Sequence, residues 1–149
     1  MPANKHGLIK KENFMTNDYE SLQPGDLVSK RLHTITEETL SIYLGAVQDQ
    51  TEILQDHDGN IATPPMAVAA ISLKGVIEDL KIPGGTLHVS QETSNINTVA
   101  VGAELTCEAN VITNSVRGAW RFLTVELKVT ADNKALVLSG KSTIMLPKN

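Results

Sequence analysis

The stretch that decides the fold is residues 64–85, PPMAVAAISLKGVIEDLKIPGG. Its apolar residues recur with the 3.6-residue period of an α-helix and almost surround the first two turns. Two prolines open the segment, and a proline at the first helical position is favourable because the amide there has no helical partner. We expect the helix to end before Pro83-Gly84-Gly85. The pattern therefore predicts one long apolar helix that something else must cover.

Downstream of this helix the hydrophobic period changes to two, which is typical of half-buried antiparallel strands. Gly140 lies within the last such segment, at a place where a curved sheet could bulge. Weaker strand patterns lie directly before and after the helical region. The strands predicted in this way, in chain order, span residues 27–32, 86–96, 104–111, 123–130 and 136–146.

A second, amphipathic helix of about three turns is predicted from Thr36 onward, with Glu37 and Glu38 at the positive end of its dipole. The predicted fold class is α+β, an antiparallel sheet of about five strands wrapped around one long central helix, because nothing else in the chain can cover that helix. We assign the domain to residues 22–147. Residues 1–21 show no sustained period and are interpreted as an N-terminal extension.

Composition and charge argue against several classes of function. The chain has 149 residues, 41% of them hydrophobic, which is enough for the core of one domain. A formal net charge of −4 argues against a nucleic-acid-binding surface, and no apolar run approaches the roughly 18 residues of a membrane span. Cys107 is the single cysteine, so no internal disulfide can form, and we expect a cytoplasmic protein.

Large apolar residues are expected on both faces of one predicted strand. Trp120 and Phe122 have the parity opposite to Leu123 and Val125. Edge-to-edge or face-to-face pairing with another subunit would cover this surplus of apolar surface. We therefore expect a dimer.

Three segments resemble parts of one known family. They are LQPGDLVSKRLHTITEETLSIYLGAVQD (22–49), PPMAVAAISLKGVIEDLKIPGGTLHVSQE (64–92) and TVAVGAELTCEANVITNSVRGAWRFLTVELKVTADNKALVLSGKSTIMLP (98–147). They look like the opening strand and helix, the central helix and the closing strands of the MaoC-like acyl dehydratase and (R)-specific enoyl-CoA hydratase family, which has the hot-dog fold. The resemblance implies binding of 2-enoyl thioesters of coenzyme A or acyl carrier protein, and it implies no cofactor.

The family's chemistry adds water to a 2-enoyl thioester or removes it. A loop motif, GDxNPxH, supplies an Asp and a His that position and activate the water, and a backbone amide at the start of the central helix holds the thioester oxygen. Paired acid and base groups suit this reaction because a proton and a hydroxide equivalent are placed on neighbouring carbons. A helix N-terminus suits it because negative charge develops on that oxygen.

This sequence departs from the motif at two positions. Asp49 stands at the family's catalytic Asp, but Leu54 stands where the His is expected, and His57 could replace it only in a remodelled loop. The family's usual Gly before Met corresponds to Pro65, which has no backbone N–H to donate. The amide of Met66 could serve if the helix shifted. We expect Leu54, Pro65 and Met66 to lie at the thioester site.

Such departures look like those of the family's non-catalytic hot-dog halves, which complete a dimer beside an intact half. The favoured hypothesis is an acyl-thioester-binding protein, homodimeric or paired with another hot-dog subunit, with weak or lost hydratase activity. Two alternatives stay open: an active enoyl-CoA hydratase or dehydratase that uses Asp49, and a hot-dog acyl-CoA thioesterase that uses Asp49 or Glu52. The acidic cluster around His57 is interpreted as a turn, not as a metal site.

Overall fold

The computed structural model describes residues 18–47, 59–132 and 135–148. Within these ranges, a 3-10 turn, η2 (Tyr19–Ser21), is followed by a strand, two helices and four strands, as the sequence predicts. The elements are β1 (Leu27–Thr34), α1 (Glu37–Ala46), α2 (Pro65–Asp79), β2 (Leu87–Asn95), β3 (Glu104–Arg117), β4 (Trp120–Ala131) and β5 (Leu136–Pro147).

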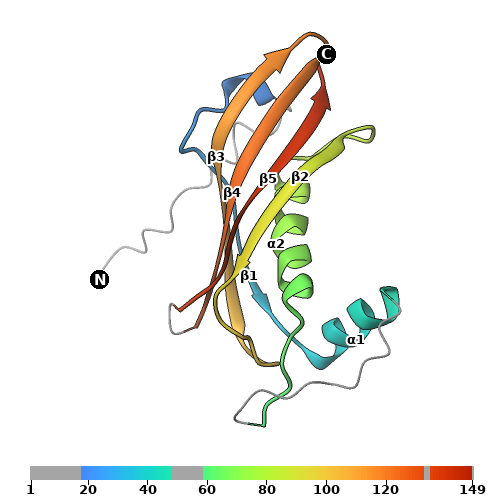
Figure 1. Ribbon diagram of the computed structural model, residues 1–149, viewed down its shortest axis with the longest axis vertical. Helices are drawn as coiled ribbons and strands as arrows, with labels where there is room; N and C mark the ends of the chain where they lie inside the picture. Colours follow the sequence, from blue (N-terminus) through green and yellow to red (C-terminus); the bar gives the residue numbers. More distant parts are fainter. Residues whose placement is uncertain (1–17, 48–58, 133–134, 149) are drawn as a thin grey trace, which may run out of the picture.

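The five strands form one antiparallel sheet in the order β1-β3-β4-β5-β2. Figure 1 shows the long, twisted sheet with α2 lying along one of its faces. Since β2 follows α2 directly in the chain but pairs only with β5, it forms one edge of the sheet, and β1 forms the other. The predicted α+β class, a sheet packed on one long helix, is therefore confirmed.

The core lies between α2 and the sheet. Alternate residues of β3 and β4 are buried, including Leu105, Leu127 and Val129 with no exposed surface, as the period of two predicts. Helix α2 presents a second face to solvent, where the side chains of Met66 and Ile77 are 64% and 45% exposed. The sheet thus covers only one side of this apolar helix. The residues that α2 buries are Ala67, Val68, Ala69, Ser72, Gly75 and Val76.

The predicted cap of α1 is present. The Thr36 hydroxyl accepts a hydrogen bond of 3.0 Å from the amide of Thr39, and Glu37 and Glu38 occupy the first turn. Leu40 is the one residue of α1 that is buried, so this helix packs lightly on the rest of the described chain. No helix in the described ranges is long and apolar enough to cross a membrane.

The expected bulge at Gly140 is wrong. Gly140 pairs in continuous register with Thr93 of β2 and with Leu127 of β4. The irregularity between β2 and β5 lies between His88 and Ser90 instead. Gly140 is required for a different reason, since a Cβ atom there would collide with the backbone carbonyl of Glu92. Its lack of a side chain lets β2 approach β5 closely.

Residues 18–21, the last part of the predicted N-terminal extension, are hydrogen-bonded to the domain. The Tyr19 hydroxyl donates to the carbonyl oxygens of Leu80 (2.8 Å) and Lys81 (3.0 Å), just beyond α2. Asn114 of β3 donates to the carbonyl of Tyr19 (2.7 Å). This turn therefore joins the sheet to the end of the central helix. The boundary at residue 22 stays a prediction, and residues 1–17 lie outside the described ranges.

The end of α2 contains the one non-glycine residue with positive φ among those described, Lys81 (φ 49°). The Ile82 amide donates to the carbonyl of Ile77 (3.1 Å) and the Lys81 amide to that of Glu78 (3.3 Å), which is the Schellman arrangement usually closed by glycine. We expect Lys81→Gly to raise the free energy of unfolding by about 0.5–1 kcal/mol, because it removes left-handed strain.

Chemical denaturation of wild type and K81G measures this gain. Lys81→Ala is the matched control, since it removes the same side chain but keeps a Cβ atom in the left-handed conformation. Equal stabilities of K81G and K81A would show that the backbone at this position carries no relievable strain.

Candidate functional site

The residues predicted to act at the site divide into two groups. Asp49, Leu54 and His57 lie outside the described residues, and their predicted roles stay predictions. Pro65 and Met66 are described and stand at the start of α2. The geometry of the site is therefore known for its helix side.

Pro65 is the first residue of α2, and Pro64 is its cap without a side-chain hydrogen bond. The carbonyl of Pro64 accepts from the amides of Ala67 (2.9 Å) and Val68 (3.4 Å), so these two first-turn amides are already bonded. Pro65 has no N–H. The amide of Met66 is thus the single first-turn donor without a partner among the described residues, and the Met66 side chain is exposed.

The segment before α2 is held in place by backbone pairing. Ala62 and Ala100 form an isolated antiparallel bridge, the Thr63 amide donates to the carbonyl of Val99 (2.7 Å), and the Val101 amide donates to that of Ile61 (2.9 Å). These bonds fix the point at which the chain enters the helix. The chain therefore enters α2 through an ordered, hydrogen-bonded segment.

Thr63 is a residue of this site that no sequence motif or period indicates. Its side chain is buried, 6% exposed, and its hydroxyl oxygen is enclosed without a hydrogen-bond partner. Such a group is destabilising by about 1–3 kcal/mol, so it is uncommon in a core. The sequence carries no signal for it, because a threonine before two prolines is an ordinary helix entrance.

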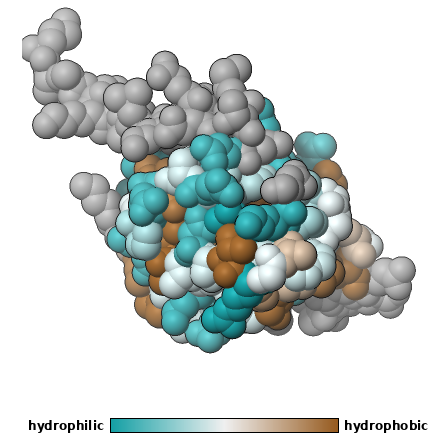
Figure 2. Space-filling view, turned by 90° about the horizontal axis from the view of Figure 1, so that it is seen from above, coloured by the Kyte–Doolittle hydropathy of each residue, from teal (hydrophilic) through white to brown (hydrophobic). Residues whose placement is uncertain are grey.

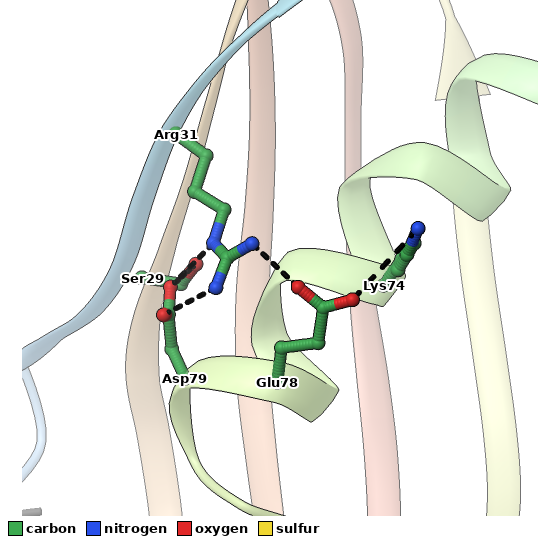
Figure 3. Close-up of polar contacts among 5 residues, drawn as sticks. All are labelled: Ser29, Arg31, Lys74, Glu78 and Asp79. Carbon is green, nitrogen blue, oxygen red and sulfur yellow. Dashed lines mark hydrogen bonds and ion pairs between the residues drawn. The ribbon is translucent and has the colours of Figure 1, made fainter. Parts of the chain in front are cut away.

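A polar cluster joins β1 to the other end of α2 (Figure 3). The Arg31 guanidinium donates to both carboxylate oxygens of Asp79 (3.1 and 2.8 Å) and also contacts Glu78. The Ser29 hydroxyl donates to Asp79 at 2.6 Å, and Lys74 lies 3.8 Å from Glu78. These hydrogen bonds raise the pKa of Arg31 and fix the helix against the edge strand.

Gly75 makes room for this cluster. A Cβ atom at Gly75 would lie 3.2 Å from Cδ of Arg31 and 3.3 Å from Oγ of Ser29. The arginine therefore passes over the helix where the helix has no side chain. The cluster is balanced in charge and is a structural tie, which periodicity alone did not indicate.

His33 lies beyond Arg31 on the same side of β1. Its Nε2 atom is enclosed and has no hydrogen-bond partner. Burial is the largest cause that lowers the pKa of His33 below its usual value of 6.5; the positive charges of Arg31 and Lys74 lower it further, and only Glu78 opposes them. The imidazole is therefore disfavoured in its charged form by the folded protein.

A lowered pKa of His33 in the folded state makes stability depend on pH. The unfolded chain binds a proton at a higher pH than the folded chain does, so stability falls as the pH drops below 6.5. The stability stops falling below the lowered pKa that His33 has in the folded state, because both states then carry the proton. We expect the melting temperature of the wild type to drop between pH 7.5 and pH 6, and that of His33→Gln to drop less. Parallel profiles for both proteins would contradict this assignment.

Cys107, the single cysteine, is buried and is not placed to act as a nucleophile. Cys107 is 4% exposed on the helix-facing side of β3, and burial raises the pKa of its thiol to about 11. The thiol therefore stays protonated near neutral pH and packs as a small apolar side chain.

At the level of sequence, no family model and no curated protein matches the chain. Structural similarity is extensive: R-hydratase PhaJ1 from Pseudomonas aeruginosa superposes with a TM-score of 0.74 at 17% identity, covering 88% of this chain and 86% of that protein. The chain has the hot-dog fold. The MaoC-like dehydratase from Rhodospirillum rubrum gives a TM-score of 0.71 at 18% identity over 87% and 96% of the two chains.

A third hot-dog neighbour comes from a complex of subunits. The HadBC (3R-hydroxyacyl-ACP dehydratase) complex from Mycobacterium tuberculosis matches with a TM-score of 0.66 at 14% identity, over 82% of this chain and 96% of that chain. MaoC-like dehydratases and (R)-hydratases are thus structural neighbours of this chain, and the similarity establishes the hot-dog fold.

Proposed function

We propose that residues 22–147 form a cytoplasmic hot-dog subunit that binds acyl thioesters of coenzyme A or acyl carrier protein and has weak or no hydratase activity of its own. Its fold neighbours include MaoC-like dehydratases and (R)-hydratases. The observation that carries the proposal is the start of α2, where Pro65 occupies the first helical position.

The chemistry of thioester hydration explains why a proline at position 65 is expected to lower hydratase activity. Negative charge develops on the thioester oxygen in the transition state, and an amide at the helix start stabilises it without reorganisation. Removing one such donor typically raises the barrier by about 2.7–4 kcal/mol. Pro65 removes the donor expected at its position, and Leu54 removes the imidazole expected in the loop. A hot-dog subunit without both groups binds a thioester more readily than it hydrates one.

The exposed surfaces support a partner along the β2 edge of the sheet. The outward face of the sheet carries the ion pairs Lys30–Glu108 (2.9 Å) and Lys141–Glu92 (4.0 Å). Near the start of β4 the same face is apolar, because Trp120 and Phe122 lie on it, as the sequence predicts. Figure 2 looks onto the end of the molecule uppermost in Figure 1, where hydrophilic and apolar residues are mixed, without one continuous apolar patch. By contrast, Leu87 and Val89 of β2 are each more than half exposed.

We infer that the subunit pairs through this edge, with a second copy or with another hot-dog subunit such as a catalytic one. The HadBC complex, which contains a neighbour of the same fold, supports association with another subunit. Edge pairing is favoured over the face-to-face arrangement because the outward face would have to bury its charged pairs. Trp120 is 37% exposed at the start of β4, and it would then lie outside the contact between subunits along β2.

Steady-state assays with short and medium 2-enoyl-CoA substrates, together with calorimetric binding of the same thioesters, test the proposed function. We expect binding with turnover below about 1 per second, the low end of the enzyme range. Restoring both missing groups in Leu54→His with Pro65→Gly is expected to raise hydration more than either change alone. Asp49→Asn in the wild-type background tests whether any residual turnover depends on Asp49, and it is expected to leave turnover unchanged.

Faster turnover that Asp49→Asn abolishes would replace the proposal with an active hydratase. Release of free thiol from acyl-CoA would replace it with a thioesterase. Absence of thioester binding at any chain length would remove the acyl-thioester function altogether.

A further inference from the structure

The enclosed hydroxyl of Thr63 is the feature of the site that packing does not explain. Thr63 precedes Pro64 and Pro65, which cap and begin α2. Its hydroxyl oxygen has no hydrogen-bond partner, whereas its amide is bonded to Val99 at 2.7 Å. A valine has nearly the same shape and would fill the position without an unsatisfied polar group. The hydroxyl is therefore costly where it stands unless something binds it.

The Thr63 hydroxyl is close in sequence to the first turn of α2, which has few free hydrogen-bond donors. Pro65 has no N–H, and the amides of Ala67 and Val68 are bonded to Pro64. Met66 alone offers a first-turn amide without a partner among the described residues. A threonine hydroxyl can donate one hydrogen bond, and rotation about its Cα–Cβ bond exchanges hydroxyl and methyl without backbone movement. It can therefore supply a second donor at this helix start.

We propose that Thr63 is a ligand-binding residue whose hydroxyl donates a hydrogen bond to the carbonyl oxygen of a bound acyl thioester, beside the amide of Met66. This inference rests on the proposed acyl-thioester function and names the group that takes over part of the role lost at Pro65. Shielding from water strengthens such a bond, because the hydroxyl has no competing partner before the ligand arrives.

Calorimetric titration with two probes tests the proposal. Butyryl-CoA carries the thioester carbonyl but has no double bond to hydrate, and S-butyl-CoA is the thioether without that carbonyl. We expect the wild type to bind butyryl-CoA more tightly than S-butyl-CoA. Thr63→Val is expected to weaken butyryl-CoA binding about tenfold and to leave S-butyl-CoA binding unchanged. Thr63→Ser keeps the hydroxyl and is expected to retain the preference.

The stability of the unliganded variants gives a second readout. Thr63→Val is expected to unfold at the same or a higher denaturant concentration than the wild type, because it removes an unsatisfied buried hydroxyl. Thr63→Ala serves in the same titrations should the valine variant not fold.

The outcomes separate the two proposals. A valine or alanine variant that still prefers butyryl-CoA as strongly as the wild type overturns the role of Thr63 and leaves acyl-CoA binding intact. Equal wild-type binding of both probes also overturns it, because the carbonyl is then not recognised. Wild-type protein that binds neither probe overturns the acyl-thioester function, and the role of Thr63 with it.

Discussion

Replacing Gly140 with alanine is expected to lower the free energy of unfolding by about 3 kcal/mol, at the upper end of the cost of overpacking a core. A Cβ atom there would collide with the carbonyl oxygen of Glu92 and lie 3.1 Å from Cγ2 of Thr93. Backbone atoms cannot rotate away as a flexible side chain can, so β2 must move off β5. We expect the melting temperature to fall by roughly 10 °C.

Thermal and chemical denaturation of Gly140→Ala measure this effect, with Gly84→Ala as the matched control. A Cβ atom at Gly84 would meet nothing within 4 Å, and Gly84 has no positive φ, so alanine there is expected to be neutral or slightly stabilising. Because Gly140 lies against the edge strand, the variant is also expected to expose β2 to hydrogen exchange before the rest of the sheet. A stability equal to that of wild type would contradict the close approach of β2 and β5.

The strands and helices were predictable because each leaves a periodic trace in the sequence. The alternation around Leu105 and Leu127 reports burial on one face of a sheet, and these side chains are indeed fully buried. Gly140 shows the limit of such reasoning. A glycine in a strand pattern indicates either a bulge or a close backbone approach, and only the neighbouring strand decides between them.

The candidate site was predictable only where it depends on one residue's covalent structure. Pro65 has no N–H in any fold, so its consequence could be stated before the structure was known. Thr63 and the Arg31–Asp79 contact depend on which segments meet in space. Hydroxyls and ion pairs have no periodicity, and their partners lie far away along the chain, 50 residues for Ser29 and Asp79 and 101 residues for Glu20 and Arg121.

The largest expected effect on assembly comes from the exposed edge strand. We expect the wild type to be a dimer at micromolar concentration, and Val89→Lys to raise its dissociation constant by about 100-fold, roughly 2.8 kcal/mol. Val89 is 51% exposed in the single chain, so a lysine there has little effect on folding but would bury an unpaired charge in the pairing. Sedimentation velocity measures the change, and Leu32→Lys, at a 65% exposed position on the opposite edge strand, is the control.

The choice between the two sheet edges follows from what each carries. The β1 edge is tied down through Arg31 to Asp79 of α2, whereas the nine residues of β2 contain neither proline nor lysine, and an irregularity between His88 and Ser90 is the edge-protecting feature that β2 has. An antiparallel strand that pairs with its own copy generates a two-fold axis, so the assembly closes as a dimer. Ile77 of α2 is 45% exposed, so the central helix also offers an apolar side chain that a second subunit could cover. Dissociation of the dimer by Leu32→Lys but not by Val89→Lys would place the contact on β1. A wild type that stays monomeric would contradict self-pairing, and β2 would then be expected to pair with a different subunit.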